Sequence, residues 1–439
     1  MTRETSTDYG KEGLCGGRGT AAAGGSGGRA ASVLLVALFA SLLSGAVLVR
    51  SAAAIPAFAR QYGASCSLCH AAYPRLNSFG EEFAARNMRL PGWRESSTMD
   101  TGDERLALPS SAPLAVRSRL YIQGRQGTEV DPVSGPTGND ADLDFQAPYL
   151  FKLFASAPLS DHITYYFYAI MAEKGANGEV VVEDAWIRHD DVFATGVALQ
   201  LGQFQISDLM FPRETRMTFQ DYMVYRMAGI TYDRGLLADR DFGPVTLALG
   251  AANGNGISQN YSINSPGYRR PDHMFDNDRN KSVYGRVGLD TEAVSVGLFG
   301  LAGRQKNAAG VAGSGSRDTA KRIVGIDISG EAQGRLYWFV QLLWNRWADF
   351  IAEGRDYDWY GGFAGMDYVA SEKWVFSLLY NYADAGDLDG TATAAYYFMT
   401  NVKGVMEVNY DFLGEDDDAD YVGHETKEGY VLVGMDAAF

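Results

Sequence analysis

Positive charge is scarce in this 439-residue chain, which carries 38 Lys and Arg against 54 Asp and Glu and a formal net charge of -16. Nucleic-acid binding needs clustered Lys and Arg to neutralise phosphates, so this balance excludes a nucleic-acid partner. The length suits two or three soluble domains or one large barrel. Membrane barrels also look soluble on average, because polar lumen-facing residues alternate with apolar lipid-facing ones. Composition therefore does not separate these two classes.

Long apolar runs are missing beyond the N-terminus. The one such run, Ser32 to Val49, follows a polar, Gly-rich leader and is followed by Ala52-Ala53-Ala54. These small residues predict an export signal over residues 1–54 that is cleaved after Ala54, and an uncleaved anchor is the alternative. After residue 54 no run approaches the roughly 20 apolar residues of a spanning helix, which excludes a helical membrane protein.

Cysteine is rare, with three residues, of which Cys15 lies in the leader. The other two belong to Cys66-Ser67-Leu68-Cys69-His70, and Cys-x-x-Cys-His is the attachment signature of c-type haem. The spacing lets two thiols bond to the two vinyl groups of one porphyrin edge while His70 becomes the proximal iron ligand. Three other uses of the two cysteines fit less well. A redox pair is expected within a βαβ pattern, which is missing nearby, and a disulfide across two residues is strained. A zinc site needs two further ligands close by. The sequence therefore predicts one covalent haem c.

The sixth iron ligand stays open between several side chains. Met88 is the nearest methionine after His70 and the first candidate, and Met99 is the second. Methionine ligation raises the haem potential relative to two histidines. Water in the sixth position is a further alternative, as is one of four histidines: His162, His189, His273 and His424.

The haem segment is short. Residues 55–110 contain many Gly, Pro and charged residues, and small domains bury too little surface to enclose a large cofactor. We therefore expect the rest of the chain to cover the porphyrin.

From residue 111 onward the apolar residues recur with a period of two. Within Gly334–Arg346, Leu336, Trp338 and Trp344 share one face, with Gln341 on the other. Such alternation predicts strands with one apolar face. About sixteen runs of this kind are present, near 114–124, 144–156, 162–173, 179–189, 196–204, 223–232, 243–252, 282–289, 293–303, 321–331, 334–346, 358–368, 373–383, 393–402, 404–412 and 428–439.

Two features favour a membrane barrel over a soluble sandwich. The last strand ends on Phe439, which shares a face with Val431, Val433 and Met435, as in the closing strand of outer-membrane barrels. Connections after odd-numbered strands are mostly long and those after even-numbered strands mostly short, which is typical of such barrels. The long connections lie near 125–143, 205–222, 253–281, 304–320, 347–357 and 413–427. We therefore expect an all-β fold: an outer-membrane antiparallel barrel of about 16 strands over residues 111–439. Its lumen is aqueous, and the haem segment plugs its periplasmic mouth.

The haem segment resembles a known family. Its lead-in, Ile55-Pro56-Ala57-Phe58-Ala59-Arg60-Gln61-Tyr62-Gly63, and the later Pro74, Leu76, Phe79 and Gly80 are similar to the fused monohaem cytochrome c–porin family. Its best-known members are Fe(II)-oxidising outer-membrane cytochromes. The resemblance covers about 30 residues closely, together with the plan of signal, one haem and barrel.

This resemblance implies electron transfer across the outer membrane. Extracellular Fe(II) is the expected donor and a soluble periplasmic cytochrome the expected acceptor, which makes the chain an iron oxidase of the Fe(II):cytochrome c oxidoreductase type. The alternatives are a porin-type transport channel with a structural or gating haem, and an electron outlet to extracellular acceptors. The expected location is the outer membrane, in contact with its lipid, with the haem segment periplasmic or inside the barrel.

Two charged features accompany this interpretation. Arg60 is a candidate partner for a haem propionate, because a guanidinium pairs well with a carboxylate; a plain surface charge is the alternative. The acidic stretch 415–420 is expected outside, where it either concentrates cations or is simply solvated.

Overall fold

The computed structural model describes residues 57–90, 98–99, 101–103, 108–109, 113–131, 135–173, 181–254, 279–291, 293–307, 317–352, 354–384, 387–399, 401–412 and 429–439. The chain divides into two compact units, 1–50 and 51–439, and all described residues belong to the second. The predicted export signal and the acidic stretch 415–420 lie outside the described residues. The boundaries at 54 and 110 stay predictions.

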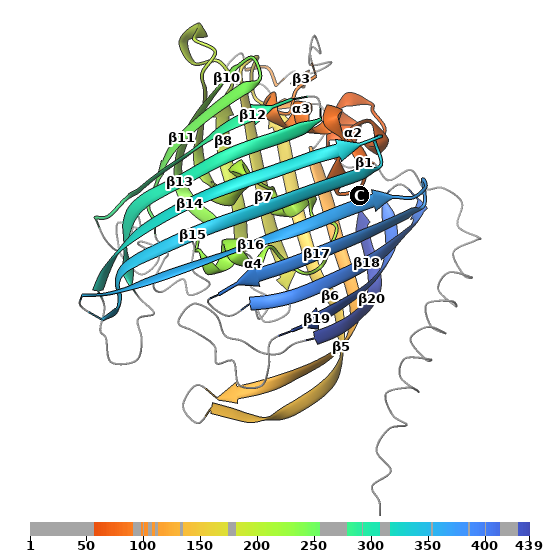
Figure 1. Ribbon diagram of the computed structural model, residues 1–439. Helices are drawn as coiled ribbons and strands as arrows, with labels where there is room; N and C mark the ends of the chain where they lie inside the picture. Colours follow the sequence, from red (N-terminus) through yellow and green to blue (C-terminus); the bar gives the residue numbers. More distant parts are fainter. Residues whose placement is uncertain are drawn as a thin grey trace, which may run out of the picture. The chain divides into compact units, whose positions relative to one another are not determined.

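Sixteen antiparallel strands, β5 to β20, close into one barrel in chain order (Figure 1). The predicted all-β antiparallel barrel of about 16 strands is confirmed, and the plug at its periplasmic mouth stays a prediction. The strands are β5 (Leu114–Asp131), β6 (Gly135–Pro158), β7 (Ile163–Glu173), β8 (Val181–His189), β9 (Ala198–Gln205), β10 (Tyr232–Phe242), β11 (Val245–Ala252), β12 (Ser282–Asp290), β13 (Val294–Asn307), β14 (Arg317–Ala332), β15 (Leu336–Ala352), β16 (Arg355–Val369), β17 (Trp374–Ala383), β18 (Asp387–Met399), β19 (Val402–Asp411) and β20 (Gly429–Ala438).

The last strand closes the barrel against the first. β20 pairs with β5 in antiparallel register, and the final residue, Phe439, exchanges two backbone hydrogen bonds with Val116. We call the end of the barrel where β5 begins and β20 ends the near mouth, and the opposite end the far mouth. The connections at the near mouth are short, and one of them contains the 3₁₀ helix η3 (Val192–Ala194).

Strand residues alternate between an apolar outer face and a mixed inner face. On β15, Leu342 and Trp344 are 57% and 42% exposed, whereas Gln341 and Asn345 are both 0% exposed. The faces predicted for this strand are confirmed. On β17 the outward side chains are again large and apolar: Phe376, Leu378 and Tyr380. None of the helices in the described part of the chain is long and apolar enough to cross a membrane.

The connection between β9 and β10 folds into the barrel. It contains η4 (Ile206–Leu209), η5 (Arg213–Thr215) and α4 (Met223–Met227), and α4 lies among the strands in Figure 1. Its Tyr222 is 1% exposed and stacks on Phe363 of β16, with 4.1 Å between ring centroids. The same buried cluster includes Val224, Tyr225, Ile230, Tyr284, Phe299, Ile323, Phe339, Leu343, Trp359 and Leu379. A hydrophobic core thus fills part of the lumen that we expected to be aqueous.

Hydrogen bonds tie this internal loop (residues 206–231) to the opposite wall. The carboxylate of Glu407 on β19 accepts from the backbone N–H groups of Phe219 and Gln220, at 2.6 and 2.9 Å. The amide of Asn381 on β17 donates to the carbonyl of Asp221 at 3.0 Å. Apolar packing and polar ties together hold the loop across the barrel.

Three boundary predictions were wrong. The sixth strand was predicted at 223–232, but residues 223–227 form α4 and the strand is β10, 232–242. The predicted loop 125–143 is mostly strand, because β5 and β6 continue as a long hairpin as far as Asp131 and Gly135. The predicted loop 347–357 is also mostly strand, because β15 runs to Ala352 and β16 begins at Arg355. The first error has a clear cause: the apolar residues of the internal loop serve the lumen core rather than a lipid-facing strand.

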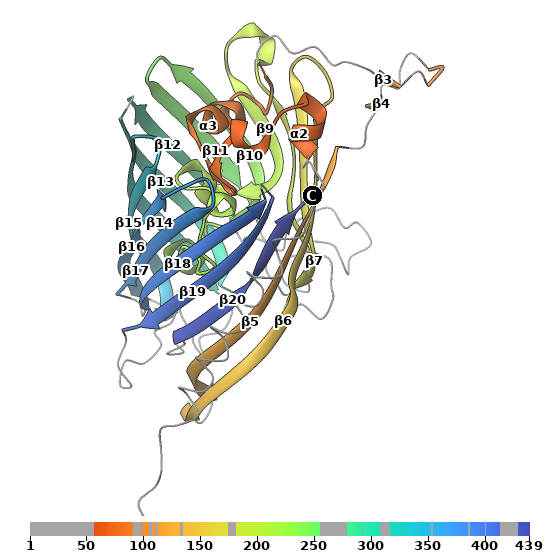
Figure 2. The same ribbon diagram turned by 90° about the vertical axis from the view of Figure 1, so that its right-hand side faces the viewer.

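The N-terminal segment (residues 57–90) is built from short elements. These are α2 (Ala57–Tyr62), η2 (Cys66–Leu68), β1 (His70–Ala72), β2 (Arg75–Leu76) and α3 (Ser78–Ala85), followed further on by the strand pair β3 (Thr98–Met99) and β4 (Leu108–Pro109). Figure 2 shows α2 and α3 at the near mouth, beside the end of the chain.

Several strands contact this segment. The ring of Phe58 meets Phe154 of β6 edge-on at 5.4 Å between centroids. The guanidinium of Arg75 pairs with Asp367 of β16, with 2.7 Å between Nε and Oδ2. The hydroxyl of Tyr397 on β18 donates to the carbonyl of Tyr73 at 2.6 Å. The segment is therefore fixed to the wall at β6, β16 and β18.

Candidate functional site

The Cys-x-x-Cys-His motif forms one compact turn. Ser65 caps η2, and the backbone N–H of Cys69 donates to the carbonyl of Cys66 at 3.2 Å. Both thiols are unpaired and partly exposed. Burial raises the pKa of Cys66 and of Cys69 above the ordinary value. The two thiols are therefore protonated at neutral pH and free to take part in thioether bonds.

Helix α3 packs tightly against this turn. Asn77 caps the helix by accepting from the N–H of Gly80 at 2.9 Å, while its own N–H donates to the carbonyl of Cys69. A Cβ on Gly80 would lie 2.0 Å from that carbonyl oxygen. Only glycine permits this approach, which gives a physical reason for Gly80 at this position.

His70 is oriented by one backbone hydrogen bond. Its Nδ1 lies 3.1 Å from the carbonyl oxygen of Pro74, and with the proton on Nδ1 this nitrogen donates. Burial lowers the pKa of His70 below its ordinary value, so the ring is neutral at neutral pH. A neutral imidazole whose Nδ1–H is held by a backbone carbonyl leaves Nε2 for a metal, an arrangement common among histidine ligands.

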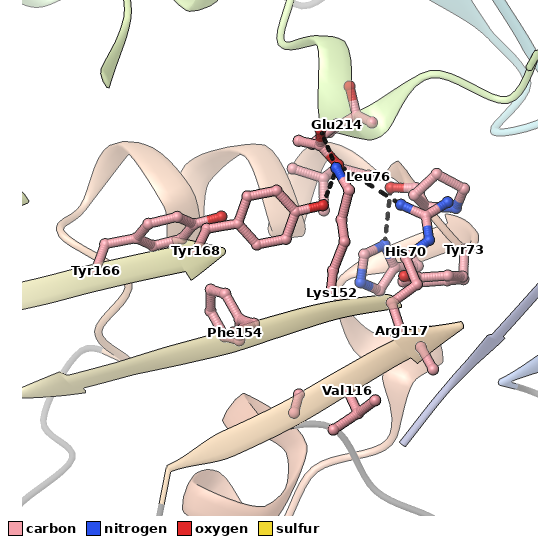
Figure 3. Close-up of a pocket in the computed structure, with 14 residues that line it drawn as sticks. His70, Tyr73, Leu76, Val116, Arg117, Lys152, Phe154, Tyr166, Tyr168 and Glu214 are labelled. Carbon is pink, nitrogen blue, oxygen red and sulfur yellow. Dashed lines mark hydrogen bonds and ion pairs between the residues drawn. The ribbon is translucent and has the colours of Figure 1, made fainter. Parts of the chain in front are cut away.

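The ring of His70 lines a cavity of about 200 Å³ inside the near mouth (Figure 3). Residues from the N-terminal segment, three neighbouring strands, the last strand and the internal loop all contribute. They are His70, Tyr73, Pro74, Leu76, Ala115, Val116, Arg117, Lys152, Phe154, Tyr166, Tyr168, Glu214, Thr215 and Ala438. The N-terminal segment, at the near mouth, and the internal loop, which enters from the far mouth, therefore meet at this cavity.

Charged side chains from the wall and the loop meet at this cavity. The ammonium of Lys152 lies 3.0 Å from Glu214 and 3.2 Å from Glu183, and the hydroxyl of Tyr168 donates to Glu214 at 2.8 Å. Arg117 on β5 pairs with Asp436 on β20. Figure 3 shows Lys152 between the tyrosine side and the His70 side of the cavity.

Two carboxylates of the internal loop are held in their ionised form. Burial alone would raise the pKa of Glu214, but the charges of Lys152 and Arg117 hold it well below the ordinary value of 4.5. Burial likewise opposes ionisation of Asp221, and Arg213 and Arg216 hold its pKa well below 3.8. Because both pKa values are lowered on folding, both groups stabilise the loop fully above their ordinary pKa values. This stabilisation declines progressively as pH falls from the ordinary values through the lowered pKa values.

We therefore expect the internal loop to loosen as pH falls below about 4.5. Hydrogen–deuterium exchange of peptides from residues 206–231 at pH 6 and pH 3.5, corrected for intrinsic exchange rates, measures this. Protection should fall in these peptides and persist in β17. Equal protection of the loop at both pH values would contradict the assigned role of Glu214 and Asp221.

The structure does not bring every candidate ligand to the cavity. Met88 follows α3, where its Sδ accepts from the hydroxyl of Ser156 at 3.8 Å, and it does not line the cavity. Cys66 and Cys69 do not line it either. The side chains of Arg60 and Met99 lie outside the described residues, as do His273 and His424.

Two of the candidate histidines form a pair elsewhere at the near mouth. The rings of His162 and His189 stack with 5.5 Å between centroids, and His162 Nδ1 lies 2.8 Å from Asp190. Neither histidine lines the cavity.

Arg117, Lys152 and Glu214 were not predicted from the sequence. The alternation of the strands was the available signal for Arg117 and Lys152, because it places each of these cations on the inner, polar face of its strand. Nothing local marks Glu214, which lies in a segment predicted to be a plain loop.

Comparisons with known proteins identify the fold. The sequence matches no protein-family profile and no curated protein sequence. Among solved structures, the outer-membrane channel DcaP of Acinetobacter baumannii has a TM-score of 0.52 at 11% identity and covers 74% of this chain and 96% of its own. OmpF of Salmonella typhi, in complex with daunomycin, has a TM-score of 0.52 at 14% identity and covers 74% and 97%. An anion-selective porin from Comamonas acidovorans has a TM-score of 0.50 at 14% identity and covers 75% and 99%. The fold is that of an outer-membrane porin-like barrel.

Proposed function

We propose that this chain is an outer-membrane barrel that holds one haem c on Cys66, Cys69 and His70 and serves electron transfer across the membrane. The observation that carries the proposal is the position of His70. Its imidazole, fixed through Nδ1, belongs to an attachment motif and also lines a cavity of the barrel interior. When bound, a haem supplies one-electron transfer, and the protein supplies its placement and potential.

The residues present fit a c-type haem in their chemistry. Two unpaired thiols have two residues between them, and His70 keeps Nε2 for the iron. Phe154 and Tyr166 give the cavity aromatic walls, and Arg117 and Lys152 give it cations. At about 200 Å³ the cavity takes only part of a porphyrin, since pockets for drug-sized ligands measure about 300–1,000 Å³. Arg60 and Met88 remain proposed as a propionate partner and as the distal ligand.

The protein's own residues would limit the access of water to this site. The internal loop packs a hydrophobic core across the lumen, with Tyr225 0% exposed. We propose that residues 57–90, which contact β6, β16 and β18, close the near mouth and that this mouth is periplasmic. An enclosed porphyrin then exchanges electrons with donor and acceptor, while solutes are kept from it.

The donor and acceptor follow from the family resemblance. Extracellular Fe(II) is the proposed donor and a soluble periplasmic cytochrome the proposed acceptor, which makes the chain an iron oxidase. The chemistry agrees with this direction, because Fe(III) is nearly insoluble at neutral pH and is best formed outside. An outlet that reduces extracellular acceptors uses the same haem in the opposite direction.

A transport channel is the second candidate, and the comparisons favour it. The similar structures include an outer-membrane channel and an anion-selective porin, and none of the three is described as an electron carrier. In this candidate the haem is structural or gates the pore. The packed lumen core is the observation that opposes a wide open pore.

Anaerobic reduction by Fe(II) tests the electron-transfer proposal. The detergent-solubilised protein, fully oxidised, is mixed with Fe(II) while its haem absorbance is recorded. Reduction is expected. An unchanged spectrum from protein that carries haem would remove the iron-oxidase proposal and leave the channel candidate.

Gly80 offers a test of how the motif is held. Gly80→Ala places a Cβ 2.0 Å from the Cys69 carbonyl oxygen, so α3 or the turn must move at a cost of about 1–3 kcal/mol. We expect a lower fraction of protein carrying covalent haem, measured as haem absorbance per polypeptide. Gly300→Ala on β13 is the matched control, because nothing lies within 4 Å of its added Cβ. Equal haem content in both variants would show that this contact is unimportant.

A further inference from the structure

In one buried group at the near mouth, cations outnumber carboxylates. Asp436 on β20 is 2% exposed and lies 2.7 Å from Arg117, 3.5 Å from Arg119 and 3.9 Å from Lys403. All three cations are nearly buried, with side-chain exposures of 9%, 12% and 3%. A second carboxylate, Glu214, lies 3.7 Å from Arg117. Three cations therefore face two carboxylates, and a buried cation is costly unless an anion accompanies it.

One donor in this group has no acceptor. Nε of Arg119 is buried and makes no hydrogen bond, although an ion-pair distance of 3.5 Å joins it to Asp436. Arg117 already fills both oxygens of Asp436, through Nε at 3.1 Å and an Nη at 2.7 Å. The group is therefore short of acceptor oxygens as well as of negative charge.

The group borders the cavity that His70 lines. Arg117 lines the cavity directly, and its guanidinium lies 5.2 Å from the ring centroid of Tyr73, three residues after His70. The ammonium of Lys403 lies 3.2 Å from the carbonyl of Tyr73. On the other side of the cavity lies Lys152, which is paired with Glu214 and Glu183.

We propose that Arg117, backed by Arg119 and Lys403, binds a carboxylate, and that this carboxylate is a propionate of the haem attached at Cys66 and Cys69. This inference rests on the proposed function. It assigns the cofactor's acidic edge to the barrel wall. Attachment is then shared between the N-terminal segment, through thioethers, and the cations of strands β5 and β19. Nε and one Nη of Arg117 donate to Asp436, so its other Nη is the group that would donate a charge-assisted hydrogen bond to the propionate.

The chain offers a matched control for Arg117. Arg286 on β12 pairs with Asp327 on β14 through Nε at 3.0 Å and an Nη at 2.5 Å. The side chains of Arg286 and Asp327 are 12% and 3% exposed, similar to 9% and 2% for Arg117 and Asp436. Arg286 does not line the cavity. Arg117→Gln and Arg286→Gln thus remove equivalent pairs from the barrel wall, and only the first removes a cation beside the proposed haem.

The test is the midpoint potential of the haem in the full-length protein, measured by spectroelectrochemical titration. Removing a cation beside the haem favours the oxidised form, so Arg117→Gln should shift the one-electron equilibrium about tenfold, which corresponds to a lowering of about 59 mV. Arg286→Gln should leave the potential unchanged. If Arg117→Gln fails to fold, as judged by loss of heat-modifiable gel migration, Arg119→Gln keeps the Arg117–Asp436 pair and should lower the potential as well.

The outcomes separate this inference from the function it rests on. Haem present in all variants with one common potential would overturn the inference and leave the proposed function intact. Absence of haem from the unaltered protein would overturn both. Unaltered potentials together with an anion-selective current that Arg117→Gln abolishes would assign the carboxylate site to a soluble anion instead.

Discussion

Cys66→Ser/Cys69→Ser protein is expected to lose its covalent haem completely while its barrel still folds. Thioether attachment needs both sulfurs, and neither thiol lines the cavity or forms a disulfide. Haem absorbance per polypeptide should fall to background, and Fe(II) should produce no spectral change. Heat-modifiable migration on gels should match that of the unaltered protein, because the strands and the internal loop are untouched.

Cys15→Ser is the matched control for this double substitution. It removes the third cysteine of the chain, which lies in the predicted export signal. Haem content should equal that of the unaltered protein. Retention of haem by the Cys66→Ser/Cys69→Ser protein would contradict the assignment of the motif.

The second large effect concerns current through the barrel. In planar bilayers the unaltered protein should give almost no conductance, because residues 206–231 pack a core across the lumen and residues 57–90 contact the wall at the near mouth. Stable steps of the size given by an open porin would contradict this and support the channel candidate.

Releasing the internal loop should open a path. Tyr222→Ala removes a ring stacked on Phe363, at a cost of about 3–5 kcal/mol for a core aromatic. Glu407→Ala removes the acceptor of the Phe219 and Gln220 N–H groups, and a hydrogen bond to a charged group contributes about 1.5–3 kcal/mol. The double variant should show conductance steps smaller than those of an open barrel, because residues 57–90 still contact the wall.

The control for this double variant changes one Tyr and one Glu that do not contact the internal loop. Tyr410→Ala lies on the outer face, where Tyr410 is 63% exposed, and Glu372→Gln lies in an exposed turn at the near mouth. This control pair should remain closed. Equal conductance in the two double variants would exclude the internal loop as the barrier.

Local pattern was enough to predict the barrel. Alternation on β15 and β17 places large apolar side chains outside, and one period of two residues decides the face of every residue in a strand. Phe439 was recognised as a closing residue because it ends an apolar stripe, and it bonds to Val116 of the first strand. These signals are read within ten or so residues of chain.

The same reasoning gave a wrong prediction for part of the internal loop. Met223, Val224 and Tyr225 are apolar because they pack in the lumen core, and their pattern was taken for a strand. The real strand, β10, carries charges that obscure its alternation. One of them, Asp239, pairs with Arg188 of β8 at 2.6 Å. A partly buried ion pair stands where the predicted strand pattern requires an apolar residue.

The electrostatics of the site depend on contacts that no local pattern records. Arg117 and Asp436 are 319 residues apart in sequence, and Arg75 and Asp367 are 292 apart. Closing the barrel brings each pair together. Sequence indicates a cation on the inner face of a strand, but the partner follows only from the register of sixteen strands.

The central claim is a haem bonded to Cys66 and Cys69 within a membrane barrel, and the intact mass of the membrane-extracted mature protein tests it most directly. We predict the mass of the polypeptide plus one haem, in the outer-membrane fraction. The mass of the polypeptide alone, or recovery of the protein in the soluble fraction, would contradict the account.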